Sequence, residues 1–124
     1  PEIFTVKLEG MDCFTYIDYV EALRLSNTLD DFNTNLKDIR YKNGNIAFKD
    51  RNHFFSDWPI QNKSNVKDVT YEIGGKNAVV VEKDLNLNSD SSTCLPGIHV
   101  VPRKFYYIPS TAVNSDITSK LNTD

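Results

Sequence analysis

Residues 11–25, written MDCFTYIDYVEALRL, contain the strongest structural signal in the sequence. The polar residues of this stretch recur at regular spacing and leave one narrow polar stripe, made of Thr15, Asp18, Glu21 and Arg24. This period predicts a helix over residues 13–27 that is buried on most of its circumference.

The start of this helix is well marked. Asp12 is the expected N-cap residue, because its carboxylate can accept a hydrogen bond from the backbone N–H groups of the first turn. Met11 is expected to pack on Tyr16 as a hydrophobic staple. In this register Cys13 is the first helical residue.

A second, amphipathic helix is expected over residues 28–39, TLDDFNTNLKDI. Asp30 and Asp31 lie in its first turn, where the helix dipole favours acidic side chains. Its apolar face consists of Leu29, Phe32, Leu36 and Ile39. The two helices predict an N-terminal helical hairpin that carries Cys13.

The rest of the chain favours strands and loops. Residues 3–8 alternate well enough for a short strand, and Asn43-Gly44 is a strong hairpin signal between two extended runs. Further strands are predicted for residues 66–73, 78–83 and 98–108, a polar loop for residues 85–96 and a helix for residues 115–121.

These elements predict an α+β fold. A helical lobe is expected over residues 1–40, followed over residues 41–124 by a β-rich lobe with a small antiparallel sheet or a barrel-like region. The length of 124 residues is enough for one modest core.

Composition and charge narrow the function classes. The net charge is -3 with both signs interspersed, which gives no field suited to nucleic acid or a membrane surface. No apolar run approaches the roughly 20 residues of a membrane span. Cys13, Cys94, His53 and His99 lack the close pairs of a zinc site. A single bridge between Cys13 and Cys94 stays open as an alternative, and we expect two free thiols.

Two roles are open to Cys13. A thiol at the first turn of a helix faces free N–H groups and the positive end of the dipole, which stabilise a thiolate and can later hold an oxyanion. The neighbouring Asp12 carboxylate opposes the thiolate unless it turns away to cap the helix. Buried free cysteines are common core residues, so spacing alone favours a place at the edge of a core.

Residues 51–58, RNHFFSDW, are dense in side chains that stack, hydrogen-bond and carry charge. Such a group can line a binding site. Its three large aromatic residues can equally fill a core while Arg51 and Asp57 pair.

Three motifs occur in order: residues 11–18 (MDCFTYID) with Glu21-Ala22-Leu23, residues 39–41 (IRY) with Gly44, and residues 51–58 (RNHFFSDW). Their order and spacing resemble the N-acetylmuramoyl-L-alanine amidase-like family of bacterial proteins, within the NlpC-type, papain-like superfamily. Residues 95–98 (LPGI) and 107–110 (YIPS) extend the resemblance over most of the chain. The resemblance implies an incomplete papain-like fold.

The activity implied by the resemblance is hydrolysis of an amide in peptidoglycan fragments. The bond joins N-acetylmuramic acid, or its anhydro form, to L-alanine. The implied partner is a muropeptide or peptidoglycan fragment, and the implied location is periplasmic or otherwise extracytoplasmic. No metal or organic cofactor is implied.

Carried over residue by residue, the resemblance makes Cys13 the nucleophile. It implies that Arg51 and His53 orient the sugar or the peptide carboxylates, Arg51 by bidentate hydrogen bonds, and that Trp58 stacks on a sugar face. The full set of implied substrate-binding residues is Asp12, Tyr16, Arg51, His53, Asp57 and Trp58.

The family's general-base histidine is expected in an Asp-Val-x-His-x-Gly segment after the final helix, and the sequence contains no such segment. We therefore expect these residues to be the N-terminal portion of a longer enzyme. Supply of the histidine by another chain, or a catalytic role for His53, are the alternatives.

Two rival functions stay open. A non-catalytic module could bind cell-wall sugar or peptide through residues 51–58 and leave Cys13 structural. A single-stranded nucleic-acid binder could use interleaved basic and aromatic residues, although the acidic balance argues against it. Those residues are Arg40, Tyr41, Lys42, Phe48, Lys49, Arg51 and Phe54.

Overall fold

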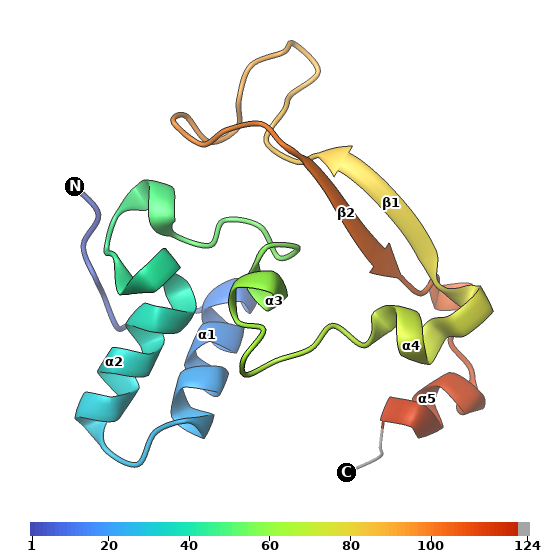
Figure 1. Cartoon of the computed structure of the whole chain (residues 1–124), viewed down its shortest axis with the longest axis horizontal. Helices are drawn as coiled ribbons and strands as arrows, with labels where there is room; N and C mark the ends of the chain where they lie inside the picture. The colour runs from blue at the N-terminus through green and yellow to red at the C-terminus, as the bar shows by residue number, and fades with distance from the viewer. Residues whose placement is uncertain (122–124) are drawn as a thin grey trace. The chain divides into compact units, whose positions relative to one another are not determined.

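The computed structural model describes residues 1–121, which form a mixed α+β chain (Figure 1). This part of the chain contains five α-helices and one two-stranded antiparallel sheet, which is an open ribbon and not a barrel. The chain divides into two compact units, residues 1–64 and residues 65–124, so the boundary expected after residue 40 falls inside the first unit. The predicted α+β class is confirmed.

Both predicted helices of the first unit are present. The N-terminus of α2 has a capping box, in which Thr28 and Asp31 each accept a hydrogen bond from the other's backbone N–H, both 3.1 Å long. The rings of Tyr19 and Phe32 join the two helices with their centres 6.1 Å apart. The elements of this unit are α1 (Cys13–Arg24), α2 (Leu29–Arg40), η1 (Lys42–Gly44), η2 (Phe48–Asp50) and α3 (Trp58–Gln61).

The burial expected for α1 is wrong. Asp18 and Glu21, which the sequence places on a polar stripe, are buried. Tyr16, Val20 and Leu23 are instead 56%, 45% and 59% exposed. A polar residue turns inward in this way only where the core offers it partners.

A buried cluster supplies those partners. Asp18 on α1 accepts hydrogen bonds from Arg40 Nε at the end of α2, at 3.1 Å, and from Trp58 Nε1 at the start of α3, at 2.9 Å. Burial raises the pKa of Asp18, and the two hydrogen bonds offset only part of that effect. Burial alone would lower the pKa of Arg40, but its interactions with Asp18 and Tyr19 hold it above its ordinary value. The cluster joins all three helices of the unit.

The expected hairpin around Asn43-Gly44 does not form strands. Asn43 and Gly44 do adopt positive φ angles of 54° and 65°, as a tight turn requires. The flanking residues make only an isolated antiparallel bridge between Tyr41 and Arg51, because residues 42–44 and 48–50 curl into 3₁₀ turns.

The strand expected over residues 3–8 is also absent from the described structure. Its backbone groups bond to side chains of the helices instead of to a neighbouring strand. Tyr19 Oη accepts from Lys7 N–H at 2.8 Å and donates to Lys7 O at 3.1 Å, and Arg40 Nη1 donates to Thr5 O at 3.0 Å. The segment is therefore attached to the middle of α1 and to the end of α2.

The second unit contains the predicted ribbon. Strand β1 pairs antiparallel with β2, from Val79 opposite Tyr107 to Asp84 opposite Pro102. The strand predicted over residues 78–83 is therefore shifted by one residue, and the strand predicted over residues 98–108 is shorter than expected. The polar loop and the C-terminal helix are also where the sequence places them. The elements are α4 (Thr70–Gly74), η3 (Gly75–Asn77), β1 (Val79–Asp84), β2 (Pro102–Tyr107), η4 (Ser110–Ala112) and α5 (Ser115–Leu121).

The strand predicted over residues 66–73 is wrong, because α4 occupies part of it. Asp68 Oδ1 accepts from Thr70 N–H at 2.9 Å and turns the chain into the helix. The helix ends at Gly74, where a side chain would bring its Cβ within 2.9 Å of both Ala78 Cβ and Ile108 Cγ1. Local side-chain bonding and this close approach override the strand pattern.

Replacing Asp18 by asparagine should destabilise the first unit by about 3 kcal/mol, because it leaves the buried Arg40 without its counter-charge. Urea unfolding followed by the fluorescence of Trp58, the only tryptophan, measures this loss. Asp30→Asn in the first turn of α2 is the matched control and should cost less than about 1 kcal/mol. Equal losses in the two variants would contradict the role assigned to Asp18.

Candidate functional site

Cys13 is the first residue of α1, and its thiol is free and exposed. The expected position at the edge of a core is thereby excluded. Cys94 is also free and exposed, so the prediction of two free thiols is confirmed.

The predicted N-cap is confirmed. Asp12 Oδ1 accepts from Thr15 N–H at 2.7 Å, and Asp12 O accepts from Tyr16 N–H at 2.9 Å. The backbone hydrogen bond from Thr15 is the main reason that the pKa of Asp12 lies below its ordinary value. Met11, the expected staple residue, is 41% exposed and Tyr16 is 56% exposed, so neither side chain is packed away.

The start of α1 leaves the Cys13 thiol and the Cys13 N–H available to a ligand. The Asp12 carboxylate is turned to the helix end, where it accepts the hydrogen bond from Thr15 N–H. Within residues 1–121, the Cys13 N–H makes no hydrogen bond. A helix of 12 residues thus presents an exposed thiol and an adjacent unpaired donor at its positive end.

Trp58 does not lie where a sugar could stack on it. Its side chain is 7% exposed, and its indole nitrogen is bonded to Asp18. The surface role expected for this residue is therefore corrected to an internal one. Phe55 of the same motif is 64% exposed, and its ring meets Phe14 edge to face at 6.4 Å, next to Cys13 in the chain.

His53 and Asp57 of the 51–58 motif are held by local contacts. His53 Nε2 lies 2.6 Å from Phe48 O, and its ring centre lies 4.5 Å from that of Phe48. Asp57 Oδ1 accepts from Ser56 Oγ at 3.2 Å. The contacts described for His53 are with Phe48. Residues 11–18 and 51–58 meet instead through the Phe14–Phe55 ring pair and through the hydrogen bond from Trp58 to Asp18.

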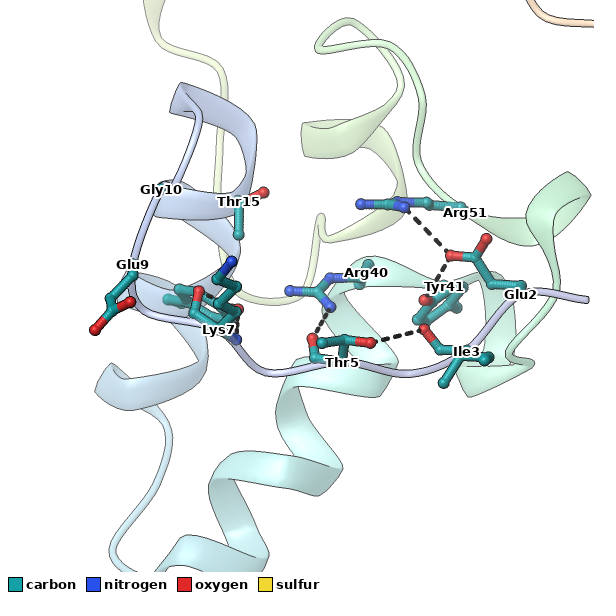
Figure 2. Close-up of a pocket in the computed structure, with 11 residues that line it drawn as sticks. Glu2, Ile3, Thr5, Lys7, Glu9, Gly10, Thr15, Arg40, Tyr41 and Arg51 are labelled. Carbon is teal, nitrogen blue, oxygen red and sulfur yellow. Dashed lines mark hydrogen bonds and ion pairs between the residues drawn. The ribbon is translucent and has the colours of Figure 1, made fainter.

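A cavity of about 290 Å³ lies beside the N-terminal segment. Figure 2 shows Glu2 between Tyr41 and Arg51, with Arg40 bonded to Thr5 nearby. Glu2 Oε1 accepts from Tyr41 Oη at 2.9 Å and from Arg51 Nη1 at 3.2 Å. Of the residues to which the resemblance assigns a catalytic or substrate-binding role, Arg51 alone lines this cavity.

The contact between Glu2 and Tyr41 could not be predicted from the sequence. The two residues are 39 positions apart and share no periodic pattern. A tyrosine directly after a basic residue at the end of an amphipathic helix is the only local signal, and many helices have one.

Metal and membrane signals are absent from residues 1–121. No group of three or more His, Cys, Asp or Glu side chains there could hold a metal ion. No helix in that range is long and apolar enough to cross a bilayer.

These features define a mixed α+β protein with an exposed thiol at a capped helix start. The chain belongs to the family described as N-acetylmuramoyl-L-alanine amidase-like, whose model matches residues 1–124. No curated protein matches the chain at a significant level.

Three solved structures are similar to the chain. A Legionella pneumophila protein is 28% identical with a TM-score of 0.64, over 86% of this chain and 46% of that one. A Bacteroides fragilis protein described as a xylanase candidate is 26% identical with a TM-score of 0.55, over 70% and 39% of the chains. An N-acetylmuramoyl-L-alanine amidase from Bacteroides uniformis is 25% identical with a TM-score of 0.55, over 69% and 38%. The chain spans less than half the length of each.

The cap predicts a specific pH dependence. Because the folded-state pKa of Asp12 lies below the ordinary 3.8, its contribution to stability is present above that value and is lost as the pH falls through the lowered pKa. Asp12→Asn keeps a capping oxygen without the charge, so wild type should lose stability relative to this variant between about pH 4 and pH 2.

Urea unfolding at several pH values measures the difference. Asp12→Ala, which removes the cap at every pH, should cost about 1 kcal/mol at neutral pH. Parallel stability curves for wild type and Asp12→Asn would contradict the assignment.

Proposed function

We propose that the chain is part of a cysteine amidase of the NlpC-type, papain-like class that cleaves peptidoglycan fragments between N-acetylmuramic acid, or its anhydro form, and L-alanine. The observation that carries the proposal is the exposed thiol of Cys13 at the capped start of α1, in a chain of the amidase-like family. The similarity to the Bacteroides uniformis amidase supports the same reaction class.

The proposed reaction is acyl transfer through Cys13. The thiolate attacks the lactyl carbonyl, and the Cys13 N–H is placed to donate to the oxyanion that forms. The C–N bond then breaks, and the nitrogen of L-alanine leaves after taking a proton from a histidine. Water hydrolyses the resulting thioester, which releases the lactyl carboxylate and restores the thiol.

The histidine of this scheme is proposed to lie outside residues 1–121. The short contact of His53 with Phe48 O supports this, because it engages the ring nitrogen locally. The size of the chain also supports it, because the chain covers 46%, 39% and 38% of the three similar structures.

Substrate binding is proposed for the exposed side of the first and third motifs. Arg51 can bind a carboxylate, His53 and Asp57 can orient polar groups of the sugar or peptide, and Tyr16 offers an exposed ring on α1. Asp12 acts by fixing the helix start that holds Cys13. Trp58 is a positioning residue that acts through Asp18.

Partner and location follow from the substrate. The partner is a muropeptide or larger peptidoglycan fragment, and peptidoglycan lies outside the cytoplasm, so a periplasmic or other extracytoplasmic location is proposed. The acidic balance of the chain gives no support to the nucleic-acid alternative.

The test uses the longer protein that contains this chain, with N-acetylmuramoyl-L-alanyl-D-glutamate as substrate and chromatography of released dipeptide as readout. Cys13→Ser should lower the rate by at least about a thousandfold, because an alcohol replaces the nucleophile. Cys94→Ser is the matched control, and its rate should equal that of wild type. Retained hydrolysis in Cys13→Ser would refute the proposal, and binding without hydrolysis in wild type would support the cell-wall module instead.

A further inference from the structure

We propose that Tyr41 and Arg51 form a binding site for a peptide carboxylate, and that Glu2 of the same chain fills this site in the structure. Tyr41 belongs to the second family motif, and the proposed reaction gives it no role. The inference deepens the proposed function by naming the group of the substrate that Arg51 holds, and it rests on that function in taking a peptide as the ligand.

The two donors meet at one point. The Tyr41 hydroxyl and Arg51 Nη1 both donate to the same oxygen, Glu2 Oε1, at 2.9 and 3.2 Å. A neutral donor and a cationic donor converge here on one carboxylate oxygen. Hydrogen bonds to an ionised acceptor are stronger than neutral ones, so this pair of donors suits a carboxylate. The bound carboxylate of Glu2 shows that the site accepts this group.

The backbone holds the donors in place. Tyr41 is 1% exposed and follows the last turn of α2, where its N–H donates to Lys37 O. An antiparallel bridge ties it to Arg51, whose own N–H donates to Ala47 O at 3.1 Å. A site fixed in this way needs little ordering when a ligand binds.

Glu2 comes from residues 1–8, which contain no helix or strand. Its side chain is 13% exposed and that of Arg51 is 41% exposed, so the ion pair is partly open to solvent and contributes little to stability. A ligand carboxylate can therefore replace Glu2 without disrupting the helices.

The surrounding cavity favours an anion. Three cationic side chains, Lys7, Arg40 and Arg51, line the cavity of about 290 Å³ with two acidic ones, Glu2 and Glu9. When Glu2 is displaced, one acidic side chain is left against three cations. The Arg40 guanidinium is 5% exposed and lies over the rings of Phe4 and Tyr19, so it contributes positive charge and no open hydrogen-bond donor.

The experiment measures binding of L-alanyl-D-glutamate, the dipeptide that the proposed reaction releases, by calorimetry at low salt in a Cys13→Ser background. Glu2→Gln should bind about fivefold more tightly, because the apparent affinity is reduced by the fraction of protein in which Glu2 fills the site. Arg51→Gln and Tyr41→Phe should each bind more weakly than the background, and the peptide diamide should gain nothing from Glu2→Gln.

Glu9→Gln is the matched control, since Glu9 also lines the cavity but has no bond to Tyr41 or Arg51. Its affinity should be unchanged, and Trp58 fluorescence verifies that every variant is folded. Equal affinities for Glu2→Gln and the background, or an equal gain with the diamide, would overturn the inference.

The two proposals can fail separately. A gain of affinity in Glu2→Gln with no Cys13-dependent hydrolysis in the longer protein would support the carboxylate site and refute the amidase. Hydrolysis that depends on Cys13, without that gain, would refute the site alone.

Discussion

The buried carboxylate of Asp18 is the constraint on which the first unit depends. It receives hydrogen bonds from Arg40 at the end of α2 and from Trp58 at the start of α3, so three helices meet at one charge. Burial disfavours this charge and raises the pKa of Asp18, whereas the hydrogen bonds from Trp58 and Arg40 stabilise the ionised carboxylate. The same bonds set the place of α1, and with it the place of Cys13.

Local signals in the sequence predicted local structure well. The cap at Asp12, the second helix and the ribbon formed by β1 and β2 all follow from short-range patterns. Of the predicted apolar face of the second helix, Phe32, Leu36 and Ile39 are buried, and Leu29 is 73% exposed. The inward turn of Asp18 could not be predicted, because its partner Arg40 is 22 positions away and a three-residue polar spacing normally indicates a solvated face. The false strand at residues 3–8 has the same origin, since its hydrogen bonds go to Tyr19 and Arg40 side chains.

The candidate site shows a similar division. The position of Cys13 as first helical residue was predictable from the cap, but the burial of Trp58 and the contact of Glu2 with Tyr41 and Arg51 were not. Both depend on residues distant in sequence. The first unit thus has two features of interest. The exposed thiol of Cys13 lies on α1, which the buried Asp18 holds in place, and the carboxylate of Glu2 is bound by Tyr41 at the end of α2.

The proposed reaction requires a covalent intermediate on Cys13. Its most direct test is acid quenching of the longer protein during turnover of N-acetylmuramoyl-L-alanyl-D-glutamate, followed by peptide mapping with mass spectrometry. We expect a muramoyl thioester on the peptide that contains Cys13. Hydrolysis without any adduct on that peptide under conditions that slow the release of the acyl group, or an adduct on Cys94, would contradict it.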